Sequence, residues 1–150
     1  RGLELAIGAR PVSRVNIRGT YTMLDTVILS VDRAAGQAPS PYNVGEALIR
    51  RPRHQGSLNA TYTGGRVTGF VDARFRGGVR DVEPSYGAFG GVFSAKGYSV
   101  LDLGAAVRVT KMFEGFARVE NAGGAHYEEA FGFPAPGAVV TVGIRFAAGR

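Results

Sequence analysis

The sequence predicts an all-β protein: about seven or eight antiparallel, up-and-down strands of a transmembrane β-barrel within 150 residues. Three observations predict this class. Apolar and polar residues alternate with a period of two along seven segments, as in strands with one apolar and one polar face. Short and long connections between these segments alternate without exception, which is typical of membrane barrels. Several segments approach the length of about 9–11 residues that crosses a bilayer at a tilt.

The first four strands are predicted in the N-terminal half. In the first, Leu3, Leu5 and Ile7 are separated by single charged or small residues. The next strands keep this spacing and carry an aromatic residue near one end, such as Tyr21 or Tyr62. The predicted ranges are 3–10, 14–23, 57–63 and 66–76.

Three more strands are predicted in the C-terminal half, over residues 101–109, 113–120 and 139–146. The last of these has an apolar residue at every second position and ends on Phe146. No segment of the chain has convincing helical spacing.

The connections fall into two classes. The short ones are tight turns of two or three residues, and the long ones have the length of functional loops. The turns are Pro11 to Ser13, Gly64-Gly65 and Thr110-Lys111, and the long connections are Asp25 to Arg53, Gly78 to Gly97 and Ala122 to Gly137. The sequence leaves two alternatives open. Either an eighth strand within residues 37–50 or 86–95 closes a small barrel, or the remaining strands of a larger barrel are absent from this chain.

Alternation alone does not separate a membrane barrel from a soluble barrel that encloses a small apolar ligand. Two features favour the membrane barrel. Charges of both signs lie mid-strand on the polar faces, as in a lumen with ion pairs: Asp72, Arg74, Asp102, Arg108, Glu114 and Arg118. Aromatic residues lie near strand ends on the apolar faces, as in an interfacial girdle: Tyr21, Tyr62, Phe75 and Phe113.

Composition and motifs exclude several function classes. The net charge is +6, but the 18 basic residues are scattered, so no nucleic-acid partner is expected. Cysteine is absent, and His54 and His126 have no flanking ligand spacing, so no metal site and no cofactor are expected. Glu128 and Glu129 are interpreted as solvated loop carboxylates rather than as a proton-transfer pair. No catalytic arrangement is found, and the protein is expected not to be an enzyme.

The runs "YSVLDLGAAVRVTKMFEGFARVEN" and "HYEEAFGFPAPG", followed by a final strand ending "VGIRF", resemble the C-terminal end of a TonB-dependent outer-membrane receptor. The run "RRPRHQGSLNATYTGG" also resembles a recurrent segment of that family, so the resemblance covers most of residues 50–146. Residues 122–124 and Ala138 depart from the family pattern. The signature positions are Asp102, Asn121, Tyr127, Gly132, Phe133, Pro134, Pro136, Gly137 and Phe146.

This resemblance implies that residues 1–150 are the C-terminal part of a larger barrel in the bacterial outer membrane, without the plug domain. It implies short periplasmic turns, long extracellular loops and import of a scarce nutrient, such as a siderophore-iron complex or cobalamin. The implied partners are outer-membrane lipid, the barrel-insertion machinery and a TonB-type energising protein that acts through the plug. The alternative is a stand-alone eight-stranded barrel with a structural or adhesive role.

Ligand contacts are expected on the extracellular loops, where function is concentrated in such folds. Four loop aromatics are the candidates for ligand binding: Tyr42, Tyr86, Phe89 and Phe93. The alternative is that these rings pack the loops against one another or against lipopolysaccharide.

Overall fold

The computed structural model describes residues 1–32, 42–82, 92–130 and 132–147, and all regular structure within these ranges is β-strand. No helix in the described ranges has the length and apolar character needed to cross a membrane. The strands are β1 (Gly2–Val12), β2 (Val15–Leu24), β3 (His54–Gly64), β4 (Val67–Arg76), β5 (Val79–Val82), β6 (Val92–Ala95), β7 (Tyr98–Arg108), β8 (Phe113–Glu120), β9 (Glu128–Ala130), β10 (Phe133–Pro134) and β11 (Val139–Phe146).

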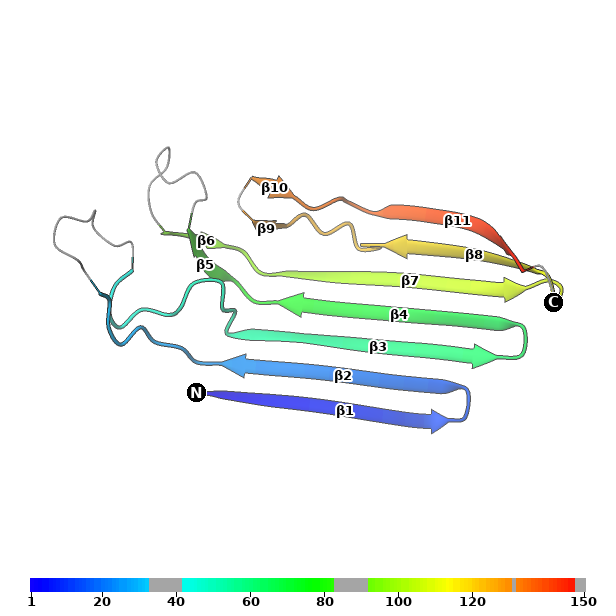
Figure 1. Cartoon of the computed structure of the whole chain (residues 1–150), viewed down its shortest axis with the longest axis horizontal. Helices are drawn as coiled ribbons and strands as arrows, with labels where there is room; N and C mark the ends of the chain where they lie inside the picture. The colour runs from blue at the N-terminus through cyan, green and yellow to red at the C-terminus, as the bar shows by residue number, and fades with distance from the viewer. Residues whose placement is uncertain (33–41, 83–91, 131, 148–150) are drawn as a thin grey trace.

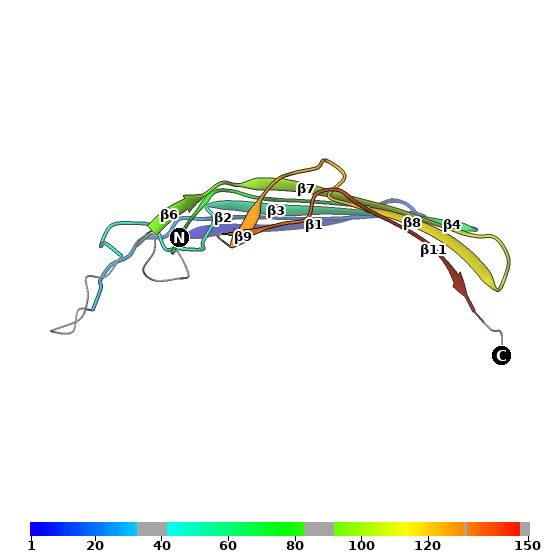
Figure 2. The ribbon, with the colours of Figure 1, turned by 90° about the horizontal axis from the view of Figure 1, so that it is seen from above.

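Seven of these strands form one antiparallel sheet in the order β1-β2-β3-β4-β7-β8-β11. They are the seven strands that the alternation predicts, and each pairs with its neighbour in the up-and-down order (Figure 1). Two begin three residues earlier than predicted, β3 at His54 and β7 at Tyr98. The sheet is a single curved layer, without a second layer packed on either face (Figure 2).

The expected eighth strand does not join this sheet in the described part of the chain. Residues 42–50 contain no strand, and residues 92–95 form β6, which pairs with β5 in a separate two-stranded sheet. Of the two alternatives that the sequence leaves open, a closing strand in these segments is therefore not found among the described residues. The sheet remains open, with β1 and β11 at its two edges.

The register places like residues on the same face of the sheet. One row of directly paired positions runs Ile7, Gly19, Leu58, Ala73 and Leu101 from β1 to β7. All large side chains of this row are apolar, and such rows make up an apolar face. Its residues stay accessible: Ile144 at one edge is 76% exposed.

The opposite, polar face follows the same register. One of its rows runs Thr22, Gln55, Arg76 and Tyr98 from β2 to β7. Among the described residues only two apolar side chains are buried, Val79 and Val100, so the sheet has no compact core. An exposed apolar face opposite a charged face is the pattern of a barrel wall in lipid, not of a soluble barrel that buries its apolar face.

Aromatic residues lie at both ends of the apolar face. At one end the Tyr21 ring lies 6.4 Å from the Phe75 ring, and its hydroxyl is 2.8 Å from His54 Nδ1. At the other end the rings of Phe113 and Phe146 are 5.1 Å apart. This placement agrees with the predicted aromatic girdles, where amphipathic rings meet the membrane–water interface.

Two glycines in the strands are covered by rings from the paired position on the neighbouring strand. Phe70 lies over Gly104 and Phe116 lies over Gly143, both on the polar face. A Cβ atom at Gly143 would come within 2.6 Å of the Phe116 ring. These pairs replace the packing that a glycine lacks and help to fix the register.

Candidate functional site

The candidate site lies at the end of the sheet where all three long connections meet. The tight turns between β1 and β2, β3 and β4, and β7 and β8 lie at the opposite end (Figure 1). The connections from β2 to β3, β4 to β7 and β8 to β11 therefore share one rim. This sorting of connection lengths was predicted from the sequence.

Two of the long connections are interlocked by ion pairs. Arg50, in the first connection, places its Nε 2.6 Å from Asp81 Oδ1 in β5, and its backbone N–H donates to the Arg80 carbonyl at 2.8 Å. Arg80 in turn places Nη1 2.7 Å from Glu46 Oε2. Asp81 is only 3% exposed, and its Oδ1 also accepts a hydrogen bond from the Val82 N–H at 2.8 Å, so this buried carboxylate has both an ion-pair partner and a backbone partner. The first connection and the β5–β6 hairpin thus form one unit.

The Glu46–Arg80 pair gives this unit a pH dependence. The hydrogen bond from Arg80 holds the pKa of Glu46 below its ordinary value of 4.5. The stability that this ion pair adds to the unit is therefore complete when the pH is above that ordinary value. It is lost as the pH falls through the lowered pKa. We expect acidification below the ordinary pKa of 4.5 to lower the protection of the Arg50 amide against hydrogen exchange, relative to the intrinsic rate at each pH. Glu46→Gln should remove most of this pH dependence, and an unchanged acid response in that variant would contradict the assignment.

The third long connection is held at its base by Asn121, which directly follows β8. The Asn121 side chain bonds both ends of the connection: Nδ2 donates to the carbonyls of Ala125 (2.8 Å) and Pro136 (3.1 Å), and Oδ1 accepts from the Ala125 N–H (2.8 Å). Asn121 has a left-handed backbone, with φ of 49°, which Asn tolerates better than most residues.

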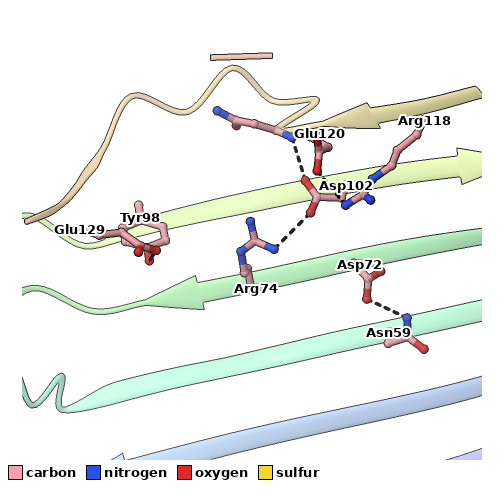
Figure 3. A network of polar contacts seen from close by, with 9 residues as sticks. Asn59, Asp72, Arg74, Tyr98, Asp102, Arg118, Glu120 and Glu129 are labelled. Atoms are coloured by element: carbon pink, nitrogen blue, oxygen red, sulfur yellow. Dashed lines mark hydrogen bonds and ion pairs between the residues drawn. The ribbon is translucent and has the colours of Figure 1, made fainter. Parts of the chain in front are cut away.

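Asn121 is itself fixed to the sheet through Asp102, which Figure 3 shows next to Arg74. The Asn121 N–H donates to Asp102 Oδ1 at 2.8 Å, and Arg74 Nη1 donates to Asp102 Oδ2 at 3.1 Å. Asp102 is 5% exposed and Asn121 is 5% exposed. A buried network in which each carboxylate oxygen has a partner rigidifies its surroundings. Strands β4, β7 and β8 and the third connection are joined through these residues.

The third connection folds back over the polar face. Its Tyr127 ring stacks on Tyr98 of β7 with the centroids 3.9 Å apart. The Tyr98 hydroxyl donates to Glu129 Oε1 at 2.9 Å (Figure 3). The Arg76 guanidinium lies over the Tyr98 ring, 4.9 Å from its centroid. Tyr98 and Arg76 were not predicted as site residues, although the alternation places both on the polar face next to the long connections.

A cavity of about 290 Å³ lies between β6 and the third connection. It is lined by Phe93 and Lys96 on one side and by His126, Tyr127 and the two glutamates Glu128 and Glu129 on the other. Rings, a cation and carboxylates around one cavity suit a ligand with apolar and charged groups. Within the described ranges, no group of three His, Cys, Asp or Glu residues is arranged to hold a metal ion.

The predicted ligand-binding residues have different positions. Phe93 lines the cavity, whereas Tyr42 lies in the first connection and is not among the lining residues. Tyr86 and Phe89 lie outside the described residues. Ligand binding by these four residues remains a prediction.

The family-signature residues fall into two groups. Asp102, Asn121, Tyr127 and Pro136 come together around the base of the third connection, as described above. The others are placed elsewhere: Gly132 at an exposed position before β10, Phe133 and Pro134 in β10, Gly137 at an exposed position before β11, and Phe146 at the end of β11 near the tight turns.

The chain is similar to one protein family and to several solved structures. The family profile described as "TonB dependent receptor-like, beta-barrel" matches residues 1–122. No curated protein sequence shows significant similarity. Similar structures include Pseudomonas aeruginosa FpvA bound to a heterologous pyoverdine and iron, with 20% identity and a TM-score of 0.71. The closed form of Fiu, a ferric-catecholate import receptor of Escherichia coli, also has 20% identity, with a TM-score of 0.74.

The structural alignment covers nearly all of this chain but only a small part of each receptor. It covers 97% of this chain in both cases, but 19% of the FpvA chain and 20% of the Fiu chain. The chain therefore spans about one fifth of the receptors it matches. At this level of identity, the structural similarity shows the fold.

Proposed function

The chain belongs to the TonB-dependent receptor β-barrel family, and on this basis we propose that it is the C-terminal part of a receptor barrel that imports a ferric siderophore. Barrels of this family are bacterial outer-membrane proteins, and the family consists of transport receptors rather than enzymes. In the proposed protein, this segment contributes wall and extracellular loops. A plug domain elsewhere in the complete receptor contacts the TonB-type energising protein.

The open sheet supports a larger barrel. Unpaired backbone groups along the free edges of β1 and β11 are costly in lipid, so each edge needs a partner strand. With no eighth strand joining the sheet in the described residues, further strands of the complete receptor are the simplest partners.

The observation that carries the ligand assignment is the cavity at the rim, where Phe93 and Tyr127 lie with Lys96 and carboxylates. Pyoverdine–iron and ferric catecholates are the ligands named for the similar receptors FpvA and Fiu. Such chelates combine flat apolar groups with charged oxygens, which aromatic and cationic side chains bind. Cobalamin, the other expected nutrient, has no comparable support.

The test is uptake of iron-55 chelates by cells that carry or lack the complete receptor, compared with cobalt-57 cobalamin. We expect iron-limited growth and uptake of one ferric chelate to require the receptor and the TonB-type partner. Tyr127→Ala should weaken binding of that chelate about tenfold, as loss of a stacking residue does at a binding hot spot. Phe133→Ala is the matched control, because Phe133 is on the same connection, 72% exposed and not part of the cavity. Unchanged uptake of every ferric chelate without the receptor would refute the proposed function.

A further inference from the structure

Each of the three tight turns at one end of the sheet carries an exposed basic residue. Arg14 lies between β1 and β2, Arg66 between β3 and β4, and Lys111 between β7 and β8. None of the three forms an ion pair within the described ranges. Two further exposed arginines without such a pair, Arg10 and Arg108, lie close to these turns in β1 and β7.

The segments around these turns contain a single carboxylate. Within residues 9–15, 63–68 and 107–114 it is Glu114, and its Oε1 lies 2.6 Å from Arg145 Nη1, so its charge is already balanced. The opposite end of the sheet differs, because acids and bases of the long connections pair there, as Asp81 does with Arg50. The end with the tight turns therefore has an excess of positive charge.

Backbone hydrogen bonds between neighbouring strands hold these cations in one row. The Arg14 carbonyl accepts from the Thr63 N–H at 2.8 Å, and the Arg66 carbonyl accepts from the Arg108 N–H at 2.8 Å. Neighbouring strands lie about 4.8 Å apart, so the row from Arg14 before β2 to Lys111 after β7 covers about 15–20 Å. Its steps are close to the Debye length of about 8 Å at physiological ionic strength, so the cations act together on an anionic surface.

The row lies directly beyond the apolar face of the sheet. At its β8 end, a groove of about 530 Å³ is lined by Lys111, by the rings of Phe113 and Phe146, and by the paired Glu114 and Arg145. The two rings are 5.1 Å apart and are 47% and 57% exposed. A cation beside exposed rings suits an amphiphile, which has an anionic headgroup next to acyl chains.

We propose that this basic edge, made of Arg14, Arg66, Arg108 and Lys111, binds phosphate headgroups of anionic phospholipids in the periplasmic leaflet. The apolar face lies against acyl chains, so residues just beyond it are at the level of the headgroups. Long basic side chains place their charge there while their methylene stems stay on apolar surface. Each Lys or Arg near an anionic surface strengthens association about fivefold. The proposal follows from the membrane orientation and does not depend on which ligand is imported.

The test compares two nitroxide-labelled lipids as quenchers of a fluorophore on the complete receptor in vesicles of phosphatidylcholine with a minority of phosphatidylglycerol. Any other cysteine is replaced, and the fluorophore is attached through Val107→Cys, at a position on the apolar face that pairs with Val67 next to Arg66. At equal nitroxide content, we expect labelled phosphatidylglycerol to quench at least about twice as strongly as labelled phosphatidylcholine. A fluorophore attached through Leu3→Cys, at the other end of the same face, should show a smaller difference.

The triple variant Arg14→Gln, Arg66→Gln and Lys111→Gln should abolish the preference for phosphatidylglycerol at position 107. The matched control removes the same number of positive charges from exposed residues outside the basic edge and should keep the preference. Its substitutions are Arg18→Gln, Arg51→Gln and Arg53→Gln. Heat-modifiable gel mobility checks that each variant is folded.

Equal quenching by the two lipids at position 107, or a preference that survives in the folded triple variant, would overturn the proposal and would indicate an acidic periplasmic protein as the partner. Loss of the preference on addition of soluble glycerol phosphate at constant ionic strength would also overturn it, since the edge would then bind a free phosphate. Uptake of the ferric chelate tests the proposed function separately, because the triple variant leaves the cavity at the rim unchanged.

Discussion

Val142→Arg is expected to destabilise the folded barrel by about 2–4 kcal/mol, the cost of an arginine on the lipid face near the bilayer midplane. Val142 lies in the interior of β11, pairs with Ala117 and is 73% exposed on the apolar face. Among the described residues of the seven strands, no carboxylate lies on this face to pair with the new charge. The free energy of unfolding of the complete receptor in lipid vesicles, measured by denaturant titration, gives this cost directly.

Thr141→Arg is the matched control for Val142→Arg. Thr141 is the preceding residue, on the polar face and paired with Arg118. An arginine here stays in the aqueous lumen, so the expected change is below about 1 kcal/mol. Equal costs for the two variants, or a larger cost at Thr141, would contradict the assignment of the faces.

Asn121→Ala is expected to destabilise the third connection by about 2.5–5.5 kcal/mol. The change removes three side-chain hydrogen bonds, two to Ala125 and one to Pro136, each worth about 0.5–1.5 kcal/mol, and places alanine in a left-handed conformation at a further cost of about 1 kcal/mol. Amide hydrogen exchange across residues 122–137 measures the effect.

Two variants separate the causes of this effect. Asn121→Gly removes the side-chain bonds but accepts the left-handed backbone, so it should be less damaging than alanine. Asn59→Ala removes the one bond that Asn59 Nδ2 donates to Asp72 Oδ1, within a regular strand of the same face, and should cost about 1 kcal/mol. If Asn121→Ala costs no more than Asn59→Ala, the connection is not held by Asn121.

The strands of the sheet could be predicted because their signal is local. Alternation such as that of Leu3, Leu5 and Ile7 indicates on which face of the strand each side chain lies. The short turns then indicate which strands are neighbours in the sheet. The short strands β5 and β6 could not be predicted, since four residues such as "VRDV" carry too little periodicity. The same ambiguity left open whether residues 37–50 or 86–95 contain a closing strand.

The site was less predictable because its contacts join distant segments. Arg50 and Asp81 are 31 residues apart, and nothing in the sequence of either connection indicates the pair. The family resemblance identified Asp102, Asn121 and Pro136 as signature positions. Only the structure shows that hydrogen bonds from Asn121 join it to the other two. Arg76 and Tyr98 were not predicted as site residues because, in the sequence, they do not differ from other polar-face residues of the strands. Only the structure shows that Tyr127 of the third connection stacks on Tyr98 and that Arg76 lies over the same ring.

The most direct test of the membrane orientation is a comparison of spin labels at Val142 and Thr141. This chain contains no cysteine, so single-cysteine variants can be labelled after replacement of any cysteine elsewhere in the complete receptor. In lipid vesicles, the label at 142 should be relaxed by oxygen, which concentrates in the bilayer. The label at 141 should be relaxed by a water-soluble nickel chelate. The reverse accessibilities, or a label at 142 that neither reagent reaches, would contradict the account.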